Sequence, residues 1–97
     1  MGIKHYREYE EIIQDLMSAI FKIEDFYDFL GMHSADWESM GKEEQLECLK
    51  TLSDDIFFGL DADPSMNIGR GIIIYDEGDT SIKVFNKGKC VGIVSLR

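Results

Sequence analysis

The stretch "GIIIYDEGDTSIKVFNKGKCVGIVSLR", residues 71–97, decides the fold of this 97-residue chain. Its β-branched runs are "GIIIYD", "TSIKVFN" and "KCVGIVSL", and the gaps between them contain "EG" and "KG". Short gaps that contain glycine between such runs are typical of hairpin turns. We therefore expect three antiparallel strands in a meander.

The register of this meander depends on the length of its turns. If both turns are two-residue loops, Ile73 lies opposite Ile82, Ile82 opposite Ile93, and Val84 opposite Val91 on one apolar face. A three-residue loop with a bulge at a turn glycine would shift this register by one residue. We expect the first arrangement because it gathers the apolar residues on one side.

The other face of this sheet is expected to be more apolar than a solvated face should be. Its members are Ile72, Ile74, Phe85, Cys90 and Val94, beside Lys83 and Ser81. Either helices cover parts of both sides, or one face or edge of the sheet contacts another chain.

The first part of the chain has a helical period instead. Apolar residues recur at alternating spacings of four and three, at Tyr9, Ile13, Leu16, Ile20, Ile23, Tyr27 and Leu30. This period predicts one long amphipathic helix over residues 6–30. Gly31 is expected to end it, because glycine readily takes the left-handed conformation found after helix ends.

A second helical region is expected over residues 34–58. Ser34 is a plausible cap for a short turn that carries Trp37, and Gly41 separates this turn from a helix over residues 42–58. Gly59 is expected to end the helix. The predicted buried stripe of this helix is Leu46, Leu49, Leu52, Ile56 and Phe57.

Residues 61–70, "DADPSMNIGR", invite a comparison with a calcium loop. Asp61, Asp63, Ser65 and Asn67 alternate as ligands do in an EF-hand. However, Met66 occupies the position that needs glycine and Ile72 the position that needs a bidentate glutamate. We therefore interpret the segment as a connector, in which Pro64 favours a turn and Arg70 is expected to pair with Asp61 or Asp63.

The predicted organisation is a single small α+β domain over residues 1–97. It comprises an acidic helical part (residues 1–60), a connector (61–70) and the meander (71–97), with the meander packed on the helices.

The net charge is −9. Residues 1–60 contain fourteen acidic and five basic residues, whereas residues 61–97 contain five of each. A surface of this sign repels phosphates, so direct nucleic-acid binding is disfavoured.

The chemistry-bearing residues do not form a catalytic signature. Asp54 and Asp55 lie near Asp61 and Asp63 in a charge-rich segment, which favours a solvated or partner-facing patch over a catalytic pair. No CxxC pair or cofactor motif is present, and we expect no metal, no cofactor and no catalytic residue. We also expect a cytoplasmic protein without a membrane partner, since no secretory leader or apolar span is evident.

These observations favour a non-enzymatic module that binds a basic protein partner, or the protein itself, through an acidic helical surface. The candidate partner-binding residues are Glu8, Glu11, Asp15, Trp37, Glu43, Glu44 and Glu47. In general character the chain resembles the small acidic α+β proteins that act as inhibitors or immunity proteins. Two alternatives stay open: a homo-oligomeric structural or regulatory protein that self-associates through its long helix or its sheet, and a small enzyme or ligand-binding protein without a sequence signature.

Overall fold

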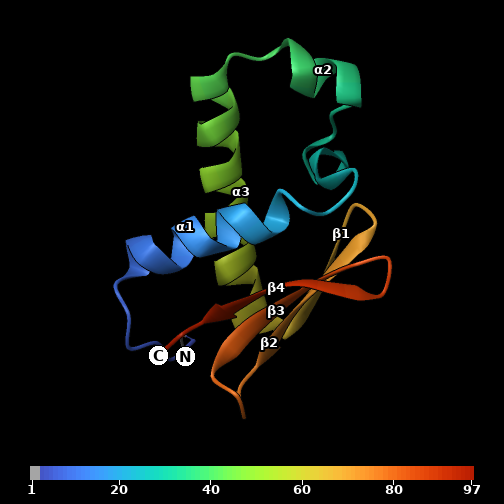
Figure 1. Cartoon of the computed structure of the whole chain (residues 1–97). Helices are drawn as coiled ribbons and strands as arrows, with labels where there is room; N and C mark the ends of the chain where they lie inside the picture. Colours follow the sequence, from blue (N-terminus) through green and yellow to red (C-terminus); the bar gives the residue numbers. More distant parts are fainter. Residues whose placement is uncertain (1–2) are drawn as a thin grey trace.

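The computed structural model describes residues 3–97 and confirms an α+β fold in which helices precede an antiparallel sheet (Figure 1). The helical part contains α1 (Tyr9–Ile20), the 3-10 helix η1 (Phe26–Leu30), α2 (Ser34–Ser39) and α3 (Lys42–Ala62). The sheet contains β1 (Ser65–Ile68), β2 (Gly71–Asp76), β3 (Ser81–Asn86) and β4 (Lys89–Ser95), in that spatial order. The helices α1 and α3 cross beside the sheet, and the first half of α3 extends away from it.

The predicted connector contains a fourth strand, so the expected three-stranded sheet is wrong. In β1, Met66 and Ile68 alternate with the exposed Ser65 and Asn67. This strand pairs with β2, with Ser65 opposite Ile74 and Ile68 opposite Gly71. The period-two alternation is the signal that identifies the strand, although four residues make it a weak one.

The predicted long helix over residues 6–30 is also wrong, because α1 ends at Ile20. Asp25 takes a left-handed conformation with φ 59°, and a 3-10 helix follows it. The backbone N–H of Arg70, in the β1–β2 turn, donates to the carbonyl of Glu24 at 3.1 Å. The sheet thus stabilises a break in a segment whose apolar period runs on. Gly31 follows the final turn with φ 73°, as predicted for a helix end.

The second long helix continues past Gly59 to Ala62, which corrects the predicted stop. A Cβ atom on Gly59 would lie 2.8 Å from the sulfur of Met66 in β1, so the glycine permits a close approach of strand to helix. Leu46, predicted to be buried, is 49% exposed. The other members of the predicted stripe are buried: Leu49, Leu52, Ile56 and Phe57.

The predicted strand register is wrong as well. Ile73 lies opposite Val84, Ile82 opposite Val94, and a bulge follows Val84. The β3–β4 turn is the expected two-residue loop, but four residues, 77–80, connect β2 to β3. In that loop the carboxylate of Asp76 accepts a hydrogen bond from the backbone N–H of Asp79 at 3.1 Å, which favours a wider turn.

The core lies between one face of the sheet and the two long helices. The fully buried side chains Ile12 and Leu16 of α1 and Ile73, Ile82 and Val84 of the sheet belong to a single apolar cluster. Among the residues 3–97, no helix is both long enough and apolar enough to cross a membrane.

Candidate protein-binding surface

The strongest concentration of unpaired charge lies in residues 28–49, which include α2 and the first turns of α3. This segment contains a single basic residue, Lys42, against six carboxylates: Asp28, Asp36, Glu38, Glu43, Glu44 and Glu47. All six are exposed, and within the described part of the chain none forms an ion pair. The negative potential of this end is therefore available to an incoming charge.

An apolar groove of about 390 Å³ lies beside two of these carboxylates. We call it the acidic groove; its lining residues are Leu30, Met32, Met40, Glu44, Glu47, Cys48 and Thr51. The left-handed Gly31 turns the chain so that the N–H of Met32 donates to the carbonyl of Tyr27 at 3.2 Å. The groove therefore combines adaptable methionine side chains with two carboxylates.

The carboxylates predicted on α1 have a different environment. Arg7 forms ion pairs with Asp15 at 2.8 Å and with Glu11 at 3.9 Å, and it also donates to the carbonyl of Ser95 in β4. Glu8 is exposed just before α1 begins. Since α1 begins far from the first turn of α3 (Figure 1), the predicted acidic set divides into two regions, and the α1 region is partly neutralised.

Trp37 is the member of the predicted set that does not reach the surface. It is 7% exposed, and its ring meets that of Phe26 edge to face with the centroids 5.0 Å apart. It also stacks near Tyr27. We therefore assign Trp37 to the core under η1 and α2, where its ring is buried and not exposed as an anchor for a partner would be.

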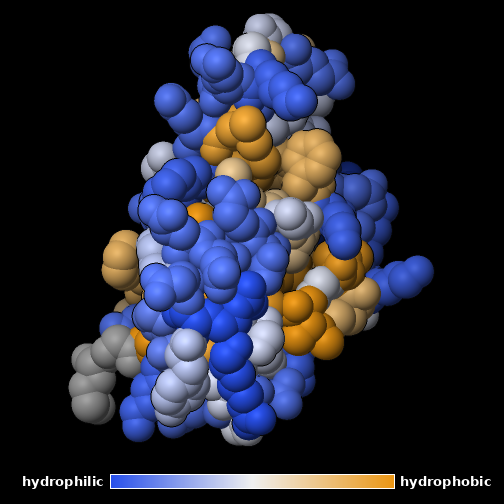
Figure 2. Space-filling model, turned by 60° about the vertical axis from the view of Figure 1, so that its left-hand side comes forward, coloured by the Kyte–Doolittle hydropathy of each residue, from blue (hydrophilic) through white to orange (hydrophobic). Residues whose placement is uncertain are grey.

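Other apolar side chains are exposed near the acidic end. Leu46 of α3 and Phe21, which is 58% exposed, line a second hollow between α1 and α3 together with Met17 and Leu49. Figure 2 shows apolar surface among hydrophilic side chains in the upper part of the molecule, at the height where α3 begins. The sequence did not predict this hollow, because the helical period of its apolar residues assigned Leu46 to the buried stripe of the helix.

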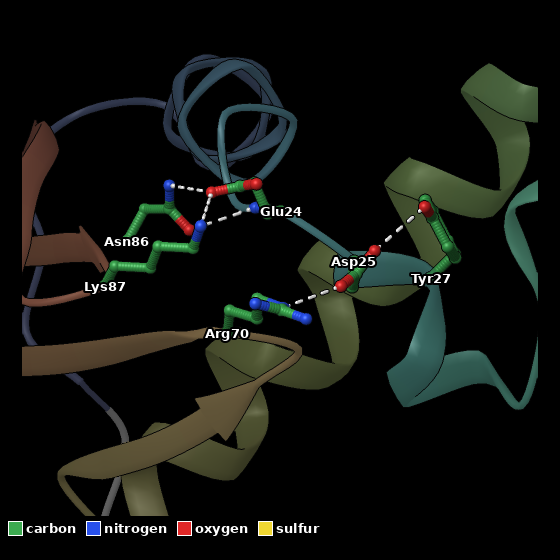
Figure 3. Close-up of polar contacts among 6 residues, drawn as sticks. All are labelled: Glu24, Asp25, Tyr27, Arg70, Asn86 and Lys87. Atoms are coloured by element: carbon green, nitrogen blue, oxygen red, sulfur yellow. Dashed lines mark hydrogen bonds and ion pairs between the residues drawn. The ribbon is translucent and has the colours of Figure 1, made fainter.

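A polar cluster joins the break between α1 and η1 to two turns of the sheet (Figure 3). The Nε of Arg70 lies 2.9 Å from a carboxylate oxygen of Asp25, and the Nζ of Lys87 lies 2.9 Å from one of Glu24. The side chain of Asn86 also bonds to Glu24, through both its amide atoms. Arg70 therefore pairs with Asp25 and not with the predicted Asp61 or Asp63.

The hydrogen bond from Lys87, followed by that from Asn86, lowers the pKa of Glu24 below its ordinary 4.5. A lowered pKa in the folded state stabilises the protein at pH values above that ordinary pKa, and the stabilisation is lost as the pH falls through the lower value.

We expect Glu24→Gln to reduce stability at neutral pH and to have little effect well below pH 4.5. Urea unfolding at both pH values measures this. Glu38→Gln, an exposed carboxylate without an ion pair among residues 3–97, is the control; an equal pH dependence in both variants would contradict the assignment.

The residues considered above for catalysis or metal binding are not arranged as a catalytic or metal site in the described part of the chain. Asp54 accepts hydrogen bonds from the hydroxyl of Tyr9 at 2.7 Å and from Lys50 at 3.2 Å, which ties α1 to α3. Burial and this bond to Asp54 raise the pKa of Tyr9, so the phenol is neutral. Asp61 lies in α3 and Asn67 in β1, so they do not surround a loop. No group of three or more His, Cys, Asp or Glu residues within 3–97 is arranged to hold a metal.

Comparisons with protein-family models, with curated proteins and with solved structures found no match for this chain.

Proposed function

We propose that the protein is a non-enzymatic binding module that docks a basic protein partner on its acidic groove and the surrounding carboxylates. The observation that carries this proposal is the position of Glu44 and Glu47, which are exposed and without ion pairs in the described part of the chain, beside an apolar hollow. Blocking a basic partner in the manner of an inhibitor or immunity-type protein is one form of this function.

The two parts of the groove have different physical roles. Carboxylates in a region of uniform sign steer a basic partner and raise its association rate. The apolar lining, which includes Met32 and Met40, gives an apolar side chain of the partner a place to bury surface, and this slows dissociation. Methionine is flexible enough to adapt to the shape of the side chain that enters.

We also place this function in the cytoplasm. Cys48 is half-buried in α3 and Cys90 is exposed in β4, and both are free thiols. Free thiols, one of them exposed, suit a reducing compartment.

The test compares a Glu44→Gln/Glu47→Gln double variant with the wild-type protein after the partner has been captured from the native host. We expect about a threefold to tenfold weaker complex, mainly through slower association, because two steering charges are removed. The association rate of the wild-type protein should also fall as salt rises. Surface plasmon resonance at several salt concentrations measures both effects.

Asp55→Asn/Glu77→Gln is the matched control, since it removes the same charge from two exposed positions outside the acidic groove. We expect its association rate to stay close to that of the wild-type protein. A complex whose rates do not depend on salt, or one weakened equally by both double variants, would argue against docking on the acidic groove.

A further inference from the structure

The sheet has one face that the helices do not cover. Strand pairing places Ile72, Phe85 and Cys90 in one row across this face and Ile74, Lys83 and Ile93 in the next. We call these six residues the outer sheet face. The opposite face carries the fully buried residues Ile73, Ile82 and Val84, which face the core.

The outer sheet face is apolar and open to solvent. Ile93 is 61% exposed and Ile72 is 43% exposed, although both lie within strands. Figure 2 shows exposed apolar surface also in the lower half of the molecule, at the height of the sheet. A solvated sheet face is normally polar, so a contiguous apolar area of this kind marks an interface.

The charges on this face favour a second copy of the chain as its occupant. The Nζ of Lys83 lies 2.8 Å from a carboxylate oxygen of Asp76 and 3.8 Å from one of Asp79. Both signs therefore occur at one place, and a two-fold axis that passes close to Lys83 would bring the lysine of each copy toward the carboxylates of the other. A strongly basic or strongly acidic partner would meet charges of its own sign as well as of the opposite sign at this place.

The distribution of charge over the chain points the same way. The segment 61–97 is neutral, whereas the net charge of −9 belongs to residues 1–60. Two sheets packed face to face lie about 10 Å apart, which keeps the helices of the two copies beyond the roughly 8 Å over which salt screens charges. The acidic helices therefore do not oppose association through the outer sheet faces.

We propose that the protein forms a symmetric homodimer in which the outer sheet face of one copy packs on that of the other. The six residues lie on the three strands β2, β3 and β4, which have a spacing of about 4.8 Å and a length of roughly 17–20 Å, so the interface is smaller than the standard specific size and falls in the range of weak, transient complexes. We therefore expect a dimer that dissociates in the micromolar range. Its two acidic grooves lie on the helical parts of the two copies, so partner binding does not compete with dimer formation.

Sedimentation velocity on the full chain, from low to high micromolar concentration, tests this proposal. We expect the wild-type mass to rise from monomer to dimer, and Ile93→Lys to remain monomeric because it places two unpaired charges in the interface. Leu46→Lys adds the same charge at a similarly exposed position on α3 and should dimerise like the wild-type protein. A monomeric wild-type protein throughout, or a dimer lost in Leu46→Lys and kept in Ile93→Lys, would overturn it.

The reactivity of Cys90 supplies a second measurement that does not depend on a variant within the outer sheet face tolerating its new side chain. In a Cys48→Ser background, Cys90 is the remaining thiol and belongs to the outer sheet face. Its rate of reaction with a water-soluble thiol reagent should fall as the protein concentration passes through the dissociation constant. A rate that does not change with concentration while the mass doubles would assign the dimer to another surface and overturn the proposal.

Discussion

Leu16→Glu is expected to unfold the protein. Leu16 is 0% exposed, on the face of α1 that packs into the core between α3 and β4. Shortening a buried leucine to alanine costs about 2–5 kcal/mol, and burying a carboxylate without a partner adds several more. The free energy of unfolding of a domain is only about 5–15 kcal/mol, so the expected loss of stability removes most or all of it. Far-UV circular dichroism and urea unfolding measure the result.

The same substitution at Leu46 separates the effect of burial from that of the added charge. Leu46 is half exposed on α3, and a glutamate there remains in solvent. We expect Leu46→Glu to change the free energy of unfolding by less than about 1 kcal/mol. A folded Leu16→Glu protein would contradict the core assignment and favour α1 as a helix-pairing seam.

Gly69→Ala is expected to have the second largest effect. Gly69 lies in the β1–β2 turn with φ 54°, a conformation that costs about 1 kcal/mol for a residue with a side chain. In addition, its new Cβ atom would meet the backbone carbonyl of Asp25 and would lie 2.8 Å from the carbonyl oxygen of Glu24. Because both contacts are with backbone, the turn must move, and the hydrogen bond from Arg70 to Glu24 is lost. We expect a loss of about 3 kcal/mol in urea unfolding.

Gly88→Ala provides a matched comparison at the β3–β4 turn. Gly88 has a similar positive φ of 81°, but a Cβ atom there would have no atom within 4 Å. We expect a loss of about 1 kcal/mol, which reports the backbone conformation alone. Equal losses in the two variants would show that the contact between the turn and Asp25 contributes nothing to stability.

Local sequence patterns correctly predicted those elements whose structure is decided by neighbouring residues. The β-branched runs and "KG" predicted β2, β3, β4 and the β3–β4 turn, and the apolar period predicted most of the buried positions of α1 and α3. The location of the unpaired carboxylates on α3 also followed from the sequence, because a charged residue on the polar side of a helix stays in solvent.

Contacts between distant segments decided the rest. The apolar period continues through Ile23 and Tyr27, so nothing local shows that bonds from the sheet stabilise a break at Asp25. The register of β2 against β3 depends on a turn that Asp76 widens. The acidic groove forms only where η1 and α2 fold over α3, which no local pattern shows. Trp37 is buried although we expected it at the surface, and Leu46 is exposed although we expected it in the core. The apolar period of a helix does not show which edge of its apolar stripe is covered by the rest of the protein.

The break at Asp25 makes the helical part depend on the sheet for its shape. The groups that stabilise it come from the two hairpin ends: the backbone of Arg70 and the side chains of Asn86 and Lys87. A fragment of residues 1–60 lacks all of them, and its apolar period favours one uninterrupted helix through Leu30. We expect such a fragment to keep every residue that lines the acidic groove but not to assemble the groove, which would make the groove a product of cooperative folding of the whole chain.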